Sequence, residues 1–127
     1  MTPPFKPQSY NSVSPYLIVD GASATIDFLV EVFGAVELRR MVREDGSIMH
    51  AEVRIDDTVV MLADGGANYP PVQSNVHVYV PDVDAAYQRA LAAGADSVQP
   101  VTRDDPDKRG GVRDSGGTTW WIATMVG

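Results

Sequence analysis

Two histidines, His50 and His77, are the side chains of this sequence best suited to acid–base chemistry near neutral pH. Glu52 follows His50 by two residues, a spacing that places both side chains on one face of a β-strand. Such groups could exchange protons with a ligand or hold it by hydrogen bonds, or could simply be hydrogen-bonded at a cavity wall or surface. The two histidines lack an evident third partner for a metal ion. Cysteine is absent, which excludes thiolate chemistry and disulfides.

These residues belong to a pattern that occurs twice along the chain. Residues 12–38 and 74–98 each contain a short β-rich run, a turn with Asp, an amphipathic helix and a Gly-Ala pair that leads into another apolar run. Equivalent positions keep a fixed offset, since Gly34 and Gly94 are 60 residues apart. This period predicts two copies of one supersecondary unit, which together bury a face that neither buries alone. A pocket between the units would be a ready ligand site.

Apolar periodicity predicts the elements of both units. In the first unit we expect a helix at 22–33 and strands at 13–19, 36–42, 48–55 and 58–63, with Met49 on the apolar face of the third strand. In the second unit we expect strands at 76–80, 111–114 and 118–124, a helix at 83–93 that begins after the N-cap Asp82, and a charged loop at 102–109. The 127 residues form one predicted domain, with module 1 at about 12–64, a Gly/Pro-rich linker at 65–73 and module 2 at about 74–126.

Composition narrows the class of partner. The formal net charge of −7 disfavours nucleic acid, whose binders usually carry a basic face. No apolar run approaches the ~20 residues that a membrane span needs. Residues 1–11 lack an apolar signal core and predict a loose Pro-rich arm. We therefore expect a cytoplasmic protein that contacts neither membrane nor nucleic acid.

Six segments carry a resemblance to a known family. In chain order they read SPYLIVDGASATIDF, FGAVE, DGSIMHAEVRI, VVMLAD, VPDVDAAYQRALAAGA and KRGGVRDSGGTTWWIAT. Together they resemble the vicinal oxygen chelate (VOC) superfamily of glyoxalases, bleomycin resistance proteins and dioxygenases, and within it the PhnB-like branch. The resemblance implies an α+β fold in which two βαβββ modules form a curved mixed sheet around a central cavity, with helices on the convex face.

The superfamily's metalloenzymes place His, Glu or Gln ligands on the first and last strands of each module. The corresponding positions in this chain hold Ser14, Met61 or Ala63, Asn75 and Trp121, of which only Asn75 could bind a metal, and weakly. We therefore expect no metal and no other cofactor, with a divalent metal as the alternative.

The polar and aromatic residues of the predicted mixed strand faces would line the cavity. The expected ligand-binding residues are Tyr16, His50, Glu52, Asn75, His77, Tyr79 and Trp121. The aromatic side chains could fill the core, or could form a stacking surface for a flat ligand at low entropy cost. Strand alternation requires that one of the adjacent Trp120 and Trp121 is buried in the core. His50 is the candidate catalytic residue, because His50-Ala51-Glu52 matches a motif of the PhnB-like branch.

These observations favour a metal-independent binding protein over an enzyme. By resemblance to bleomycin resistance proteins, it would sequester or carry an apolar or aromatic organic ligand, as in antibiotic resistance, and would form a homodimer. The alternative is an enzyme, either a glyoxalase-like metal-dependent lyase, isomerase or dioxygenase, or a metal-free acid–base enzyme that uses His50. A third alternative is that Trp121 fills the cavity and leaves a structural or partner-binding protein.

Overall fold

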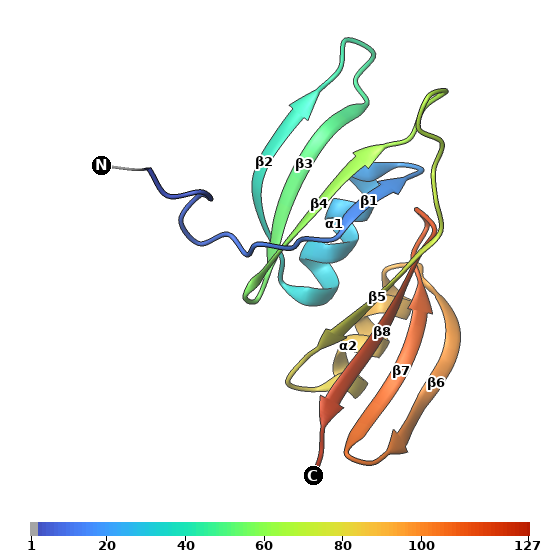
Figure 1. The fold of residues 1–127 in the computed structure, drawn as a ribbon. Coiled ribbons are helices and arrows are strands. Elements are labelled where there is room, and N and C mark those ends of the chain that lie inside the picture. Colours follow the sequence, from blue (N-terminus) through green and yellow to red (C-terminus); the bar gives the residue numbers. More distant parts are fainter. Residues whose placement is uncertain (1–2) are drawn as a thin grey trace.

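Both halves of the chain fold with the same order of elements (Figure 1). The computed structural model describes residues 3–127, so the first two residues of the predicted arm lie outside it. Module 1 consists of β1 (Tyr16–Val19), α1 (Ala22–Phe33), β2 (Val36–Val42), β3 (Ile48–Ile55) and β4 (Thr58–Asp64). Module 2 consists of β5 (Ser74–Tyr79), α2 (Val83–Ala92), β6 (Asp96–Asp104), β7 (Asp107–Arg113) and β8 (Thr118–Met125). The predicted α+β fold of two βαβββ modules is confirmed.

Each module forms a four-stranded mixed sheet. The strand orders are β1-β4-β3-β2 and β5-β8-β7-β6, so the two sheets have the same topology. In each sheet the first strand pairs in parallel with the last, and the other pairs are antiparallel. The last strand of each module therefore lies inside its sheet, and β8 is flanked by β5 and β7. This shared topology is the structural form of the repeat in the sequence.

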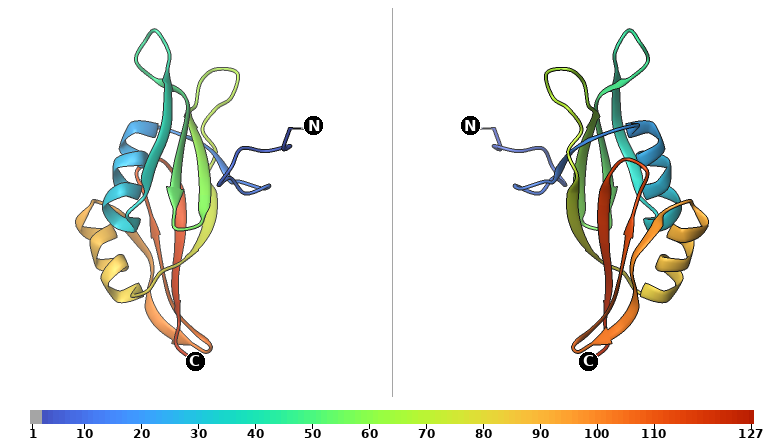
Figure 2. Two further views of the ribbon diagram at one scale, coloured as in Figure 1. Left: turned by 90° about the vertical axis from the view of Figure 1, so that its left-hand side faces the viewer. Right: turned by 90° about the vertical axis from the view of Figure 1, so that its right-hand side faces the viewer.

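Both helices lie on one side of the sheets, and the N-terminal segment lies on the other side (Figure 2). The apolar strand residues that face the helices form one core shared by both modules. Phe33 at the end of α1 packs against the fully buried Trp120 of β8, with 5.4 Å between ring centroids. The Arg89 guanidinium of α2 donates two hydrogen bonds to the carbonyl of Val32 in α1, at 3.1 and 2.9 Å. Among residues 3–127, no helix is long and apolar enough to cross a membrane.

The amino end of α1 is capped from another strand. Its N-cap residue Gly21 has no side chain to accept a hydrogen bond, and the Asp64 carboxylate at the end of β4 takes that role. Asp64 Oδ1 accepts from the amides of Gly21 and Ala22 at 3.1 and 2.7 Å, while Oδ2 accepts from the Ile48 amide at 2.7 Å. One carboxylate thus fixes the start of α1 and the start of β3 together.

The amino end of α2 uses the equivalent strand position. As predicted, Asp82 is the N-cap, and its carboxylate accepts from the Ala85 amide at 3.1 Å. Thr124 on β8 lies 60 residues after Asp64, and its hydroxyl accepts from the Val83 amide at 2.9 Å. The Thr124 hydroxyl also donates to the carbonyl of Val80 at 2.8 Å. Both modules therefore anchor their helix from the last strand, with a carboxylate in one and a hydroxyl in the other.

The predicted charged loop at 102–109 is wrong. These residues form a β-hairpin, in which β6 continues to Asp104, β7 begins at Asp107, and Arg103 pairs with Lys108. The Arg103 guanidinium also contacts the Asp105 carboxylate in the turn at 2.6 Å, with both side chains exposed. Arg103 and Asp105 remain in solvent although Arg103 belongs to a strand, so polarity does not distinguish a strand from a loop.

Two further details of the strands differ from expectation. β1 begins at Tyr16 and not at residue 13, since the segment before it ends in Pro15, which has no amide hydrogen for a sheet ladder. Met49 is 44% exposed and not part of the apolar face. A bulge in the β2–β3 pairing leaves Met49 between the paired residues Ile48 and His50, and Ile48 takes the buried position instead.

Candidate ligand-binding face

The sheet surface opposite the helices, called here the open face, carries all seven residues predicted to bind a ligand. In module 1 they are Tyr16, His50 and Glu52, and in module 2 they are Asn75, His77, Tyr79 and Trp121. The pairing register places them there, because residues that pair across neighbouring strands share a face. Tyr16 and Tyr79 are 50% and 60% exposed, and both lie on strands at the edges of the two sheets.

A chain of hydrogen bonds joins four residues of module 1, called here the module 1 cluster: Tyr10, Tyr16, His50 and Glu52. The Tyr16 hydroxyl lies 2.8 Å from His50 Nδ1, and His50 Nε2 lies 2.7 Å from Glu52 Oε2. The Tyr10 hydroxyl donates to Glu52 Oε1 at 2.5 Å. The Glu52 carboxylate is buried at 5% exposure, so it depends on these two donors in place of water.

The partners of the His50 ring determine where its protons lie. An ionised carboxylate only accepts hydrogen bonds, so His50 Nε2 carries a hydrogen and donates it to Glu52. In the neutral imidazole, Nδ1 then accepts from the Tyr16 hydroxyl. Protonation of Nδ1 would reverse this bond, making the Tyr16 oxygen the acceptor. The cluster therefore has the connectivity of an acid–base relay, with the half-exposed Tyr16 as its outer end.

Two pKa values in this cluster are displaced in opposite directions. Burial on its own would raise the pKa of Glu52, but the hydrogen bonds from Tyr10 and His50 outweigh it and hold the pKa below its ordinary value. The pKa of Tyr10 is raised, chiefly because its hydroxyl hydrogen is held by the Glu52 carboxylate and secondarily by burial. Glu52 is therefore the ionised member of the pair and Tyr10 the neutral donor.

Tyr10 was not among the residues predicted from the sequence, because residues 1–11 were expected to form a loose arm. The end of this arm is instead fixed to module 1. The Asn11 side-chain oxygen accepts from the Val59 amide at 2.9 Å, and the Ser9 carbonyl accepts from the Arg54 guanidinium at 3.3 Å. Tyr10 and Glu52 are 42 residues apart in the sequence, and no local pattern in the arm predicts their contact.

In module 2, Trp121 and Asn75 form the first of two contacts between predicted residues. The Trp121 indole nitrogen donates to the Asn75 side-chain oxygen at 3.1 Å. The Trp121 ring lies over Gly111 of β7, where a Cβ atom would come within 2.7 Å of the ring. Glycine therefore allows the indole to lie flat against the sheet. Trp120 is the fully buried member of the tryptophan pair, as alternation requires.

His77 and Tyr79 form the second contact, which continues to two residues that the sequence analysis did not place in the site. Their ring centroids lie 4.8 Å apart in an edge-on arrangement. The Tyr79 hydroxyl donates to Asp107 Oδ2 at 2.9 Å, and this bond raises the pKa of Tyr79. Arg109 Nη2 donates to the same oxygen, also at 2.9 Å. Asp107 and Arg109 are not among the predicted ligand-binding residues, because their segment was expected to be a solvated loop.

Two of the hollows formed by residues 3–127 differ in character. A groove of about 330 Å³ lies between the modules, and His77 and Tyr79 of β5 line it together with Pro15, Thr58 and Val60. The other five predicted residues lie on the open face outside this groove.

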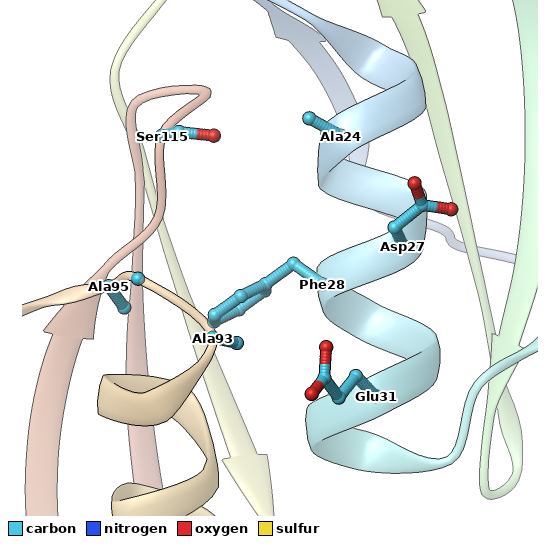
Figure 3. Close-up of a pocket in the computed structure, with 8 residues that line it drawn as sticks. Ala24, Asp27, Phe28, Glu31, Ala93, Ala95 and Ser115 are labelled. Carbon is cyan, nitrogen blue, oxygen red and sulfur yellow. The ribbon is translucent and has the colours of Figure 1, made fainter.

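The second hollow, of about 190 Å³, lies between the helices on the opposite side (Figure 3). There Phe28 reaches from α1 toward Ala93 at the end of α2, with the carboxylates of Asp27 and Glu31 beside it. It contains none of the predicted residues.

The residues at the superfamily's metal positions do not fit a metal ion. The Asn75 oxygen is taken by the Trp121 indole, and the Ser14 hydroxyl accepts from the Asn11 amide at 3.0 Å. Met61 and Ala63 offer no strong ligand atom. Within residues 3–127, no three His, Asp or Glu side chains gather in a geometry suited to metal binding.

Comparison with known proteins places this geometry in a family. A relative from Mycobacterium bovis, described as an uncharacterized protein, is 41% identical over 128 residues, which is 91% of this chain and 84% of the relative. TioX from Micromonospora sp. ML1 has a TM-score of 0.71 and 30% identity, over 90% of this chain and 95% of its own.

Two more distant structures share the fold alone. TnmS3, an antibiotic binding protein from Streptomyces sp. CB03234, has a TM-score of 0.69 and 20% identity, over 91% of this chain and 99% of its own. A PhnB protein from Bacillus cereus has a TM-score of 0.70 and 17% identity, over 90% and 99%. The sequence pattern of one family matches residues 10–122. This chain belongs to the Glyoxalase/Bleomycin resistance protein/Dioxygenase superfamily.

Proposed function

We propose that the open face binds a small, flat, apolar or aromatic organic molecule without a metal, and that the protein sequesters or carries this molecule. The proposal rests on the position of the Trp121 ring. Its ring lies over Gly111 on the side of the sheet away from the core, with Tyr79 and His77 on the neighbouring strand. Broad aromatic surface with a few polar atoms beside it is the usual composition of a small-molecule site.

Relatives with the same fold support this class of function. TnmS3 is an antibiotic binding protein, so the fold accommodates ligands of that kind. Within the superfamily we place the chain in the PhnB-like branch, on the basis of the His50-Ala51-Glu52 motif. We also propose that residues 1–127 form a single domain, and the core shared by both modules supports this. A cytoplasmic location is part of the same proposal.

We infer that a second copy of the chain completes the site. One chain leaves the open face uncovered at large apolar side chains that include Tyr16, Tyr79 and Met125, the last of them 71% exposed. Exposed apolar surface of this kind marks an interaction site. A second copy laid on this face would enclose the aromatic residues, so that the homodimer would hold two equivalent cavities.

Binding of 2-methoxynaphthalene, measured by titration calorimetry, tests the proposed function. Trp121→Leu should weaken binding about tenfold, because aromatic stacking contributes about 1–1.5 kcal/mol beyond buried area. Tyr69→Leu, at a 75% exposed linker position, is the matched control and should leave binding unchanged. Equal binding by wild type and Trp121→Leu, or no binding at all, would contradict the proposal. Sedimentation of the wild type tests the dimer separately.

The connected Tyr16, His50 and Glu52 side chains favour one second candidate, a metal-free acid–base enzyme. In this function the His50 relay would take a proton from a carbon atom next to a carbonyl group, through the Tyr16 oxygen or directly. The methyl group of 2-acetonaphthone is a flat aromatic probe for such a reaction. Deuterium exchange at this methyl group in D₂O, faster with wild type than with His50→Gln, would support catalysis, and equal rates would exclude it for this probe.

A further inference from the structure

Two buried polar atoms on the open face of module 2 have no partner within the protein. Asp107 is 5% exposed, and its Oδ2 atom accepts from both Tyr79 and Arg109, but its Oδ1 atom is covered and unpartnered. Arg109 Nε is likewise covered and unpartnered. A buried carboxylate oxygen and a buried guanidinium hydrogen each lose the solvation that water would give them. A ligand group that hydrogen-bonds to either atom would recover this lost free energy.

These two atoms are complementary in kind. Asp107 Oδ1 can only accept a hydrogen bond, and Arg109 Nε can only donate one. The residues are two apart on β7, so their side chains leave the same face of the strand. A ligand group that offers an N–H beside a C=O would satisfy both atoms at once.

The charges of Asp107 and Arg109 restrict the kind of ligand group further. The Asp107 carboxylate and the Arg109 guanidinium are ion-paired at 2.9 Å, so the pair is neutral overall. A charged ligand group would be attracted by one member and repelled by the other, whereas a neutral amide gains from both. The chemistry of the two atoms thus fits a primary or ring amide better than an amine or a carboxylate.

The aromatic surface lies at a suitable distance from this pair. Gly111, which lies under the Trp121 ring, is two residues beyond Arg109 on β7. Alternate residues of a strand are roughly 6.7 Å apart. Ala123, which pairs with both Tyr79 and Arg109, has only a methyl group on the row between them. A flat ring on Trp121 would therefore place a substituent of ordinary size over Arg109, whose guanidinium holds the Asp107 carboxylate at 2.9 Å.

We propose that Asp107 and Arg109 form an amide-recognition subsite, which selects ligands that carry a primary or ring amide beside the aromatic system stacked on Trp121. This inference rests on the proposed binding function and adds the ligand's polar group to it. Admission of the amide requires the 60% exposed Tyr79 side chain, whose hydroxyl is bonded to the other oxygen of Asp107, to turn outward.

Titration calorimetry with two matched probes tests the subsite. 2-Naphthamide has both the N–H and the C=O, and N,N-dimethyl-2-naphthamide has the same ring without the hydrogen. The wild type should bind 2-naphthamide about tenfold more tightly, the effect of one net hydrogen bond to a charged group. Asp107→Asn should remove this preference, because the charged acceptor of the N–H is gone. Arg109→Lys keeps the charge but lacks the Nε donor to the C=O, which both probes carry, so it should weaken the binding of both probes alike and retain the preference.

The chain offers a matched control in the same hairpin. Arg103 Nε contacts Asp105 at 2.6 Å, with side chains 61% and 67% exposed, so Arg103→Lys and Asp105→Asn make the same chemical changes at an exposed pair. These variants should keep the full preference for 2-naphthamide. Equal affinity of the wild type for both probes would overturn the subsite and leave the aromatic site intact. Failure of both probes to bind would overturn the subsite together with the proposed function.

Discussion

Tyr10→Phe removes a single oxygen atom from the module 1 cluster and tests whether the N-terminal arm is held by Glu52. The lost bond is a hydrogen bond of 2.5 Å to a carboxylate that is 5% exposed. Hydrogen bonds to charged groups contribute about 1.5–3 kcal/mol, and the partial exposure of Tyr10 to solvent reduces this. We expect the free energy of unfolding to fall by about 1–2 kcal/mol at pH 7. Urea unfolding followed by circular dichroism measures it.

The stability difference between the wild type and Tyr10→Phe should depend on pH in a definite direction. The pKa of Glu52 is held below its ordinary value of 4.5, so the unfolded chain binds a proton more readily than the folded chain. The stability that Glu52 contributes is therefore present above the unfolded pKa and is lost as the pH falls through the folded pKa. In Tyr10→Phe the depression is smaller, because one donor is gone while burial still raises the pKa. The difference between the two proteins should be full at about pH 6 and should shrink between about pH 5 and pH 3.

Comparison of the two proteins removes the contribution of the other carboxyl groups, since the chain has 17 acidic residues that titrate in the same range. Tyr69→Phe, at a 75% exposed position of the linker, is the control and should follow the wild type at every pH. If Tyr10→Phe also followed the wild type, the arm would not be held by this bond. A difference that grew as the pH fell would refute the assigned protonation of Glu52.

Two further changes test how the modules are built. Asp64→Ala removes the acceptor of three backbone amides and should lower the free energy of unfolding by about 2–3 kcal/mol, whereas Thr124→Val, at the equivalent position of module 2, should cost about 1 kcal/mol, as measured by urea unfolding. Equal losses would contradict the assigned roles. Gly111→Ala places a methyl group within 2.7 Å of the Trp121 ring and should cost about 1–3 kcal/mol and shift the tryptophan fluorescence, while Gly66→Ala, with nothing within 4 Å, should leave the fluorescence unchanged.

The repeat and the helices could be predicted from the sequence because their signals are local. Apolar spacing predicts α1 at 22–33, where the structure has it, and Gly34 ends it in the left-handed conformation that glycine adopts readily. The bulge at Met49 could not be predicted in this way, since it is a property of how β2 pairs with β3. At a bulge the sequence still alternates between apolar and polar residues, but the side chains no longer alternate between the two faces of the sheet.

The site was predicted in part for the same reason. Alternation places His50 with Glu52, and His77 with Tyr79, on one strand face each, and these pairs are in contact in the structure. Tyr10 lay beyond prediction, because its contact with Glu52 depends on the path of an irregular segment. The signal that could have found the other missed residues is the alternation of Asp107, Arg109 and Gly111 along one strand.

The position of β8 has a consequence for synthesis of the protein on the ribosome. Module 1 can pair all its strands once residue 64 has been made, whereas the sheet of module 2 lacks β8, one of its two inner strands, until residues 118–125 follow. At ~5–20 residues per second, this gap lasts for several seconds. During that time Phe33 has no Trp120 to pack against, and the nascent chain presents an unfinished apolar surface to chaperones. Slow codons between the two modules would lengthen that exposure, and slow codons after residue 125 would not.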